Sequence, residues 1–141
     1  MYEMSRDEWR AFVLDGTRTG KLATVRADGA PHVTPVWFLL DGDDFVFTTH
    51  ETSVKGRGLR RDPRVSLLVD DERPPFSYVL IEGDASVETD LGRLREWATR
   101  IGGRYMGGDR AQEYGARNGV EGELLVRVTP MKVLARGGIA D

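Results

Sequence analysis

The segment from residue 48 to residue 64 combines small hydroxyl side chains with an excess of basic ones. Residues 54–64 include five basic side chains and one acidic side chain, a local charge of +4 within a chain of net charge −3. The hydroxyls come first, at Thr48, Thr49 and Ser53. A helix predicted to begin after Ser53 offers free N–H groups that favour an anion, and Lys55 and Arg57 can add charge-assisted hydrogen bonds. This pattern predicts a phosphate-binding segment.

An alternative interpretation of the same segment needs no ligand. A solvated basic turn would place Arg60 and Arg61 near the C-terminal end of the helix, where their charges complement the helix dipole. Gly56 and Gly58 are poor helix formers, but they allow a ligand or a second backbone segment to approach closely. The segment lacks the G-x-x-x-x-G-K-[ST] motif, and no G-x-G-x-x-G follows a predicted strand. The residues alone therefore leave both interpretations open.

Two histidines and three aromatic residues are weaker candidates for a functional role. His32 could donate a proton, but a histidine at a strand end is more often a surface or structural residue, and His50 is interpreted as a loop residue. Trp97, Tyr105 and Tyr114 fall on helical segments, where we expect them in the core or as a lid over a pocket. The sequence contains no nucleophile elbow and no credible Ser-His-Asp arrangement. We therefore assign no catalytic side chain.

Length and composition are those of an ordinary globular protein. The 141 residues fit one domain, residues 1–141, with 40% hydrophobic and 30% charged residues. An acidic balance, with a pI near 5.5, argues against binding to nucleic acid or to a membrane surface. With no cysteine and two histidines, we expect no disulfide and no metal centre. The charged N-terminus and the lack of an apolar run of about 18 residues predict a cytoplasmic protein.

Hydrophobic periodicity divides the chain into short strands and a few helices. Ser5 and Glu8 form a capping box that starts a helix ending near Leu14. Further helices are predicted at residues 53–61, 91–105 and 110–117. Six strands are predicted at residues 21–26, 31–40, 45–49, 64–69, 78–87 and 122–135, and the first three are expected to form a meander. This order predicts a mainly β protein of the α+β kind, a six-stranded antiparallel barrel with a few peripheral helices.

Five consecutive apolar residues, 36–40, interrupt the alternation expected of a strand with one wet face. Both faces of this stretch must then be buried. Either closure of the barrel or a partner subunit would bury the second face.

At the level of whole segments the chain resembles a known family. Residues 22–37 are similar to the opening hairpin of the pyridoxamine-phosphate-oxidase-like split barrels. The segments 47–49, 54–65 and 79–83 follow in that family's order and spacing. The resemblance covers roughly residues 5–135. Within this family, the chain resembles the actinobacterial branch that uses coenzyme F420, an 8-hydroxy-5-deazaflavin. The sequence departs from the family at Gly56 and Gly58, where relatives often carry Ala and Asn.

This resemblance implies a homodimeric split β-barrel with two cofactor sites at the subunit interface. Lys55 and Arg57 would hold the cofactor phosphate, together with neighbouring residues of the basic segment: Thr48, Thr49, Ser53, Val54 and Gly56. The ring system would lie against residues that follow one another along the chain: Val33, Thr34, Pro35, Val36 and Trp37. Tyr78 of the partner subunit would close the pocket.

The function implied by the resemblance is hydride transfer. A cofactor of this kind carries the chemistry, which fits the absence of an acid–base pair in the sequence. The expected protein is an oxidoreductase that uses coenzyme F420 to reduce a small electron-poor organic substrate, such as a conjugated alkene or a quinone-like compound. Two alternatives remain, an FMN-dependent reductase or oxidase on the same fold and a non-catalytic deazaflavin carrier.

Overall fold

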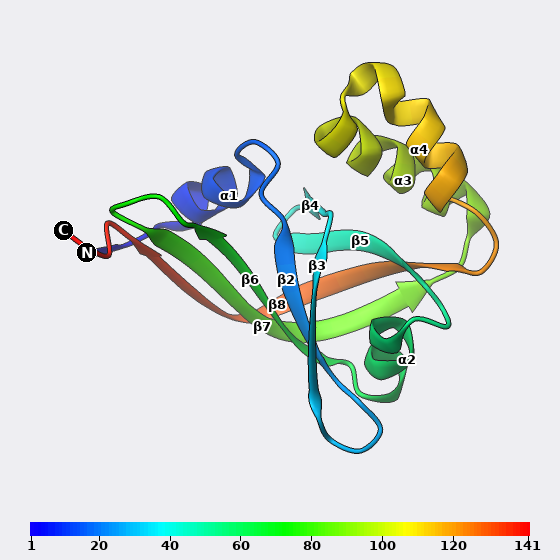
Figure 1. Ribbon diagram of the computed structural model, residues 1–141, viewed down its shortest axis with the longest axis horizontal. Coiled ribbons are helices and arrows are strands. Elements are labelled where there is room, and N and C mark those ends of the chain that lie inside the picture. The colour runs from blue at the N-terminus through cyan, green and yellow to red at the C-terminus, as the bar shows by residue number, and fades with distance from the viewer.

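A computed structural model describes all residues 1–141 as one curved antiparallel sheet with helices placed around it (Figure 1). The strands are β1 Tyr2–Glu3, β2 Gly20–Val25, β3 Pro31–Val36, β4 Leu39–Asp41, β5 Asp44–His50, β6 Arg64–Asp71, β7 Ser77–Glu88 and β8 Glu123–Gly137. The helices are α1 Arg6–Leu14, α2 Val54–Arg61, α3 Leu91–Met106 and α4 Ala111–Asn118, with a 3-10 turn, η1, at Gly108–Arg110.

The sheet runs in the order β3-β2-β6-β7-β8-β5-β4, and β1 pairs with β8. All of these pairs are antiparallel, and no ladder joins β3 to β4. The barrel is therefore split, and the prediction of a mainly β split barrel with peripheral helices is confirmed. It has eight strands where the sequence pattern predicted six.

The predicted helices and the first hairpin are confirmed. Ser5 accepts a hydrogen bond from the backbone N–H of Glu8, and the Glu8 carboxylate accepts one from the N–H of Ser5, which completes the capping box of α1. The turn between β2 and β3 has a positive φ at Gly29, +87°, a conformation that glycine adopts without steric cost. No helix in the structure is both long enough and apolar enough to cross a membrane.

The single strand predicted over residues 31–40 is wrong, because residues 37–38 interrupt it and divide it into β3 and β4. The predicted meander is confirmed only in part: β2 pairs with β3 and β4 pairs with β5, but β5 pairs on its other side with β8, and no ladder joins β3 to β4. The backbone groups of Phe38 bond instead to α3: its N–H donates to the Tyr105 hydroxyl (3.2 Å), and its carbonyl accepts from Arg104 (2.7 Å). Local alternation cannot show this break, because the partners lie more than sixty residues away.

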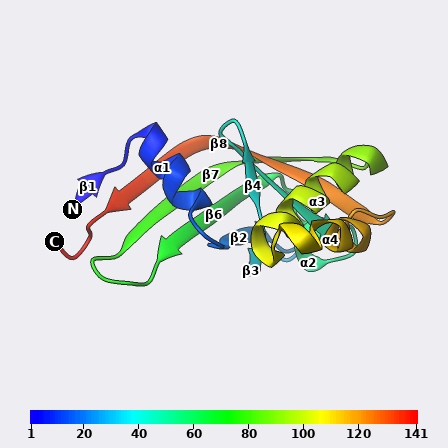
Figure 2. The same ribbon diagram turned by 90° about the horizontal axis from the view of Figure 1, so that it is seen from above.

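Aromatic and branched side chains fill the inside of the curved sheet. Phe38, Phe45 and Phe47 are fully buried there, and Phe38 packs on Phe45 with ring centroids 5.1 Å apart. Helix α1 covers part of this core through Trp9, whose ring stacks on that of Phe45. The chain termini lie together at the end of the molecule away from α3 and α4 (Figure 2).

Helices α3 and α4 form a tightly packed pair that covers the β3–β4 break. A side chain at Gly102 would collide with Tyr114, and one at Gly115 would collide with Thr99, so both glycines are needed for the close approach. The apolar stretch 36–40 is therefore covered on its second face by helices of the same chain, which the sequence pattern did not indicate. Trp37 packs against Tyr105 and Tyr114, and Leu39 packs on a small core cluster with Trp97.

Arg104 ties this helical pair to the barrel. Its half-buried guanidinium donates hydrogen bonds to the carbonyls of Val13 (2.8 Å), Gly16 (3.1 Å) and Phe38 (2.7 Å). The group also lies 4.7 Å over the Phe38 ring. Burial lowers the pKa of Arg104 from its ordinary value, and the carbonyl oxygens compensate the lost hydration of the cation.

Replacing Arg104 by methionine tests how much the fold depends on this contact. The Arg104→Met side chain keeps the apolar stem but leaves several carbonyls without a donor, so the free energy of unfolding should fall by about 2–4 kcal/mol. Urea denaturation measures this loss. The control Arg95→Met, at an exposed position of the same helix, should change stability by less than about 0.5 kcal/mol. Equal effects of the two substitutions would contradict the assignment.

Candidate functional site

A cavity of about 460 Å³ lies where the β3–β4 break, the end of β5, the start of α2 and the α3–α4 pair meet. Its volume is within the range of small-molecule binding sites, roughly 300–1,000 Å³. The lining residues are Pro35, Val36, Trp37, Thr48, Thr49, His50, Lys55, Ala98, Ile101, Arg117, Asn118 and Glu123. Six of them are among the thirteen residues predicted to bind a cofactor: Pro35, Val36, Trp37, Thr48, Thr49 and Lys55.

Hydroxyl groups of Thr49 and Ser53 build the turn that leads into α2. The Ser53 hydroxyl donates to the His50 carbonyl (2.8 Å) and accepts from the N–H of Gly56 (2.9 Å), which makes Ser53 the N-cap of α2. The buried Thr49 hydroxyl lies 3.0 Å from the Ser53 hydroxyl. The two side chains therefore hold the end of β5 and the start of α2 in place, and the hydroxyl of Ser53 forms its hydrogen bonds within the chain.

Close backbone packing explains the two glycines of α2. A side chain at Gly56 would collide with the His50 carbonyl, and one at Gly58 would lie 3.1 Å from the Val25 carbonyl. The sequence left open whether these glycines make room for a ligand or for a second backbone segment. In the structure, both glycines make room for a backbone segment.

Lys55 is the basic residue of α2 that reaches the cavity. It is half-buried there, and the twelve ion pairs of the chain are formed by other residues. Arg57 is exposed and does not line the cavity, since two residues along a helix correspond to a rotation of about 200°. Val54, also predicted to contact the cofactor, is exposed at the first position of the helix.

Residues 33–37 are not all on one side of the structure. Val33 projects from the outer face of β3 with 60% of its surface exposed, whereas Val36 points inward and is buried. The hydroxyl oxygen of Thr34 is buried and has no hydrogen-bond partner. An unpartnered buried hydroxyl is costly, so this oxygen marks a place where a polar group of a ligand or a water molecule would be stabilised.

Trp37 forms an aromatic wall of the cavity. Its ring stacks on Tyr105 with centroids 5.1 Å apart and planes 7° apart, and it meets Tyr114 at 5.7 Å in a tilted arrangement. The Tyr105 hydroxyl donates to the Arg18 carbonyl (2.8 Å), and burial raises the pKa of Tyr105. The Trp37 ring is therefore held by side chains of α3 and α4.

Helix α4 and the start of β8 contribute cavity residues that the sequence did not reveal. Arg117 and Asn118 come from the end of α4, and Glu123 is the first residue of β8, opposite His50 in the β5 ladder. Burial raises the pKa of Glu123, while the nearby charges of His50 and Lys55 lower it. No local motif marks these residues, because Arg117 and Asn118 reach the cavity through the packing of α4 on α3, and Glu123 reaches it through the pairing of β8 with β5.

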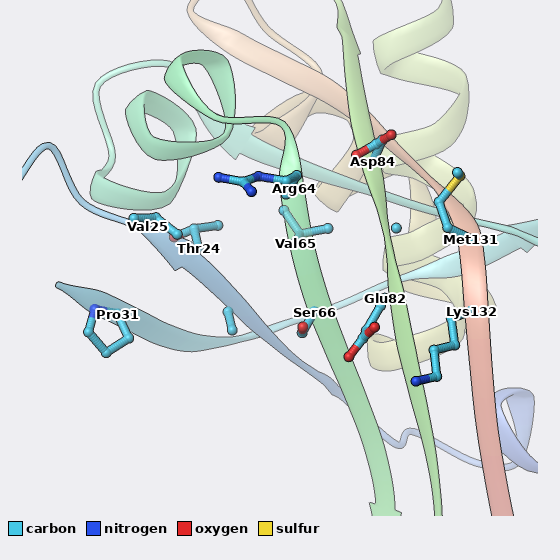
Figure 3. Close-up of a pocket in the computed structure, with 12 residues that line it drawn as sticks. Thr24, Val25, Pro31, Arg64, Val65, Ser66, Glu82, Asp84, Met131 and Lys132 are labelled. Atoms are coloured by element: carbon cyan, nitrogen blue, oxygen red, sulfur yellow. The ribbon is translucent and has the colours of Figure 1, made fainter. Parts of the chain in front are cut away.

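Tyr78 lies outside this cavity. It stands near the start of β7, in a separate hollow of about 470 Å³ that also includes Phe76 and Ile139. A further hollow of about 610 Å³ lies over β2, β6, β7 and β8, where the labelled side chains of Ser66, Glu82 and Lys132 come from adjacent strands (Figure 3).

The cavity has the parts needed for a flat, phosphate-bearing ligand. Trp37 and Val36 make part of its lining aromatic and apolar, and Lys55 and Arg117 add two cations to the lining. These residues fit a planar ring against the end of β3 and an anionic group at the start of α2.

Solved structures with the same fold include proteins of several kinds. A conserved hypothetical protein from Mycobacterium tuberculosis superposes with a TM-score of 0.84 at 28% identity, covering 96% of this chain and 86% of that one. An F420 reductase superposes at 0.69 with 26% identity, covering 87% and 94%. An FAD-binding protein from Mesorhizobium loti, at 18% identity and a TM-score of 0.68 over 95% and 93%, shares the fold.

The family model described as pyridoxamine 5'-phosphate oxidase matches residues 5–136, nearly the whole chain. The expected resemblance to this family is thereby confirmed over the predicted range. With its split barrel and the cavity between β3, α2 and the helical pair, this chain belongs to the pyridoxamine 5'-phosphate oxidase family.

Proposed function

We propose that this protein is an oxidoreductase that binds coenzyme F420 and transfers hydride to a small electron-poor organic substrate, such as a conjugated alkene or a quinone-like compound. The observation that carries the proposal is the cavity in which the Trp37 wall and the half-buried Lys55 face a common space. Membership of the family and the likeness to an F420 reductase support it. An FMN-dependent reductase or oxidase and a deazaflavin carrier are the alternatives.

Each part of the cavity would have a distinct task. Bound deazaflavin supplies the hydride chemistry. Trp37, Pro35 and Val36 would hold its ring flat and exclude water from one side. Lys55 would bind the phosphate, together with the N–H groups at the start of α2, and Thr48 would contribute its hydroxyl from the cavity wall.

A second copy of the chain would complete the site. The outer face of the sheet carries exposed apolar side chains, among them Val33 (60% exposed) and Met131 (73% exposed), and the 610 Å³ hollow lies on it (Figure 3). We propose that this face pairs with its copy in a homodimer, because apolar side chains on an open sheet favour such burial. Tyr78 of the partner subunit would then close the cavity, in keeping with its position away from the cavity of its own chain.

Cofactor titration decides between the proposed function and its alternatives. Purified protein is titrated with F420 and, separately, with FMN, and binding is followed by absorbance and fluorescence. Tight F420 binding with turnover of a quinone or conjugated alkene would support the proposal. A tightly held yellow flavin in the purified protein would support the FMN alternative, and F420 binding without turnover of any acceptor would support a carrier.

The phosphate contact is tested on α2. Lys55→Ala should weaken cofactor binding roughly 10- to 100-fold, because one charge-assisted hydrogen bond is worth about 1.5–3 kcal/mol. Arg57→Ala should have a smaller effect, since Arg57 does not line the cavity. Arg60→Ala, which removes an exposed charge from the same helix, is the control. Unchanged cofactor affinity in Lys55→Ala would reject the phosphate site. A large loss of cofactor affinity in Arg57→Ala would show that Arg57 also binds the phosphate.

The ring contact is tested at Trp37. Trp37→Ala should weaken F420 binding roughly tenfold, because it removes the aromatic wall, whereas Trp37→Phe should keep most of the affinity. Circular dichroism checks that both variants are folded. Full affinity in a folded Trp37→Ala protein would show that the ring lies elsewhere.

The dimer is tested by sedimentation velocity at micromolar concentration. The wild-type protein should sediment as a dimer, and Met131→Glu should shift it toward the monomer by placing a charge on the proposed interface. Leu91→Glu, at an exposed apolar position on α3, should leave the dimer intact. A monomeric wild-type protein would reject the interface.

A further inference from the structure

The charged side chains that line the cavity include one acid among two cations. Lys55 comes from α2, Arg117 from α4 and Glu123 from β8. These three side chains together carry a net charge of +1. A site that binds phosphate through cations gains nothing from a carboxylate, so the presence of Glu123 needs an explanation.

Glu123 is fixed at this position by the sheet. Its backbone pairs with His50 of β5, one step from Thr49, whose hydroxyl contacts the N-cap of α2. The residue also borders a second hollow, which Glu51 and Glu121 line. The charged or titratable groups around Glu123 are therefore His50 of β5, Lys55 of α2, Arg117 of α4 and the acids Glu51 and Glu121. Its own carboxyl is partly buried, and this burial raises its pKa.

We propose that Glu123 is a specificity-determining residue, which makes the cavity favour a phosphodiester carrying one negative charge over a phosphate monoester carrying two. The inference rests on the proposed function, because it assumes that the cofactor phosphate binds beside Lys55. It also bears on the choice of cofactor, since the phosphate of coenzyme F420 is a diester and that of FMN is a monoester.

The physical reason lies in how two energies depend on charge. Attraction to the site rises in proportion to the ligand charge, whereas the Born cost of removing the ligand from water rises with its square. Glu123 lowers the positive potential that Lys55 and Arg117 create in the cavity. At this lower potential, a single charge is still attracted at a modest desolvation cost, but a second charge costs more than it gains.

The same argument predicts the effect of removing the carboxylate charge. Glu123→Gln raises the potential at the phosphate position, and the resulting gain in binding free energy is proportional to the ligand charge. Affinity for a monoanion should rise by some factor, and affinity for a dianion should rise by the square of that factor. We expect roughly threefold and roughly tenfold.

Three ligands that share one ring system provide the test: riboflavin with no phosphate, its 5'-methyl phosphodiester with one charge, and FMN with two. Their affinities are measured by displacement of F420 at about pH 8, where the monoester carries two charges because its second pKa is about 6. The wild-type protein should bind the diester more tightly than FMN. Glu123→Gln should leave riboflavin unchanged, strengthen the diester and strengthen FMN most.

Glu121→Gln is the matched control, because it removes an equal charge from an acid two residues away that does not line the cavity. Equal gains for riboflavin and FMN in Glu123→Gln would overturn the inference, since the residue would then act on the ring or on the fold. A gain of the same size in Glu121→Gln would also overturn it. A failure of FMN to displace F420 from the Glu123→Gln protein would overturn the inference as well. A wild-type protein that binds none of these ligands would instead reject the proposed function.

Discussion

The backbone of Phe38 is held by a helix rather than by a neighbouring strand, and the rest of the architecture depends on this contact. Tyr105 and Arg104 of α3 take over the hydrogen bonds that a sheet partner would supply. The chain can therefore leave the ladder after β3 without a buried backbone group losing its partner. The barrel stays split at this point, and the α3–α4 pair is anchored over the opening.

The cavity is a consequence of this split. Because Phe38 turns into the core, Trp37 turns the other way and stacks between the barrel and the aromatic side chains of α3 and α4. The same helical pair brings Arg117 into the lining of the cavity, which also includes Lys55. The hydrogen bonds of the Phe38 backbone to α3 thus determine both the position of the aromatic wall and part of the charge in the cavity.

The basic segment shows how far a local pattern can predict a site. Its position and its helix, predicted over residues 53–61, follow from local signals in the sequence, and the structure contains this helix with Ser53 as its N-cap. Which of its charges point to the cavity does not follow from the pattern, because that depends on the rotation of α2 against β2. In the structure Gly58 lies against the Val25 carbonyl, Lys55 lines the cavity, and Arg57 is exposed outside it.

Sequence alone determined the helices and the first hairpin, because capping boxes, turns and alternation act between residues close along the chain. The resemblance of whole segments to a known family identified the fold, and local charge singled out the candidate phosphate segment. Only the tertiary structure decided the β3–β4 break, the pairing of β5 with β8, and the presence of Arg117 and Glu123 at the cavity. These features depend on contacts between segments distant in sequence. The hydrogen bonds from side chains of α3 and the packing of α4 on α3 have no signature in the local sequence. They are therefore evident only in the folded structure.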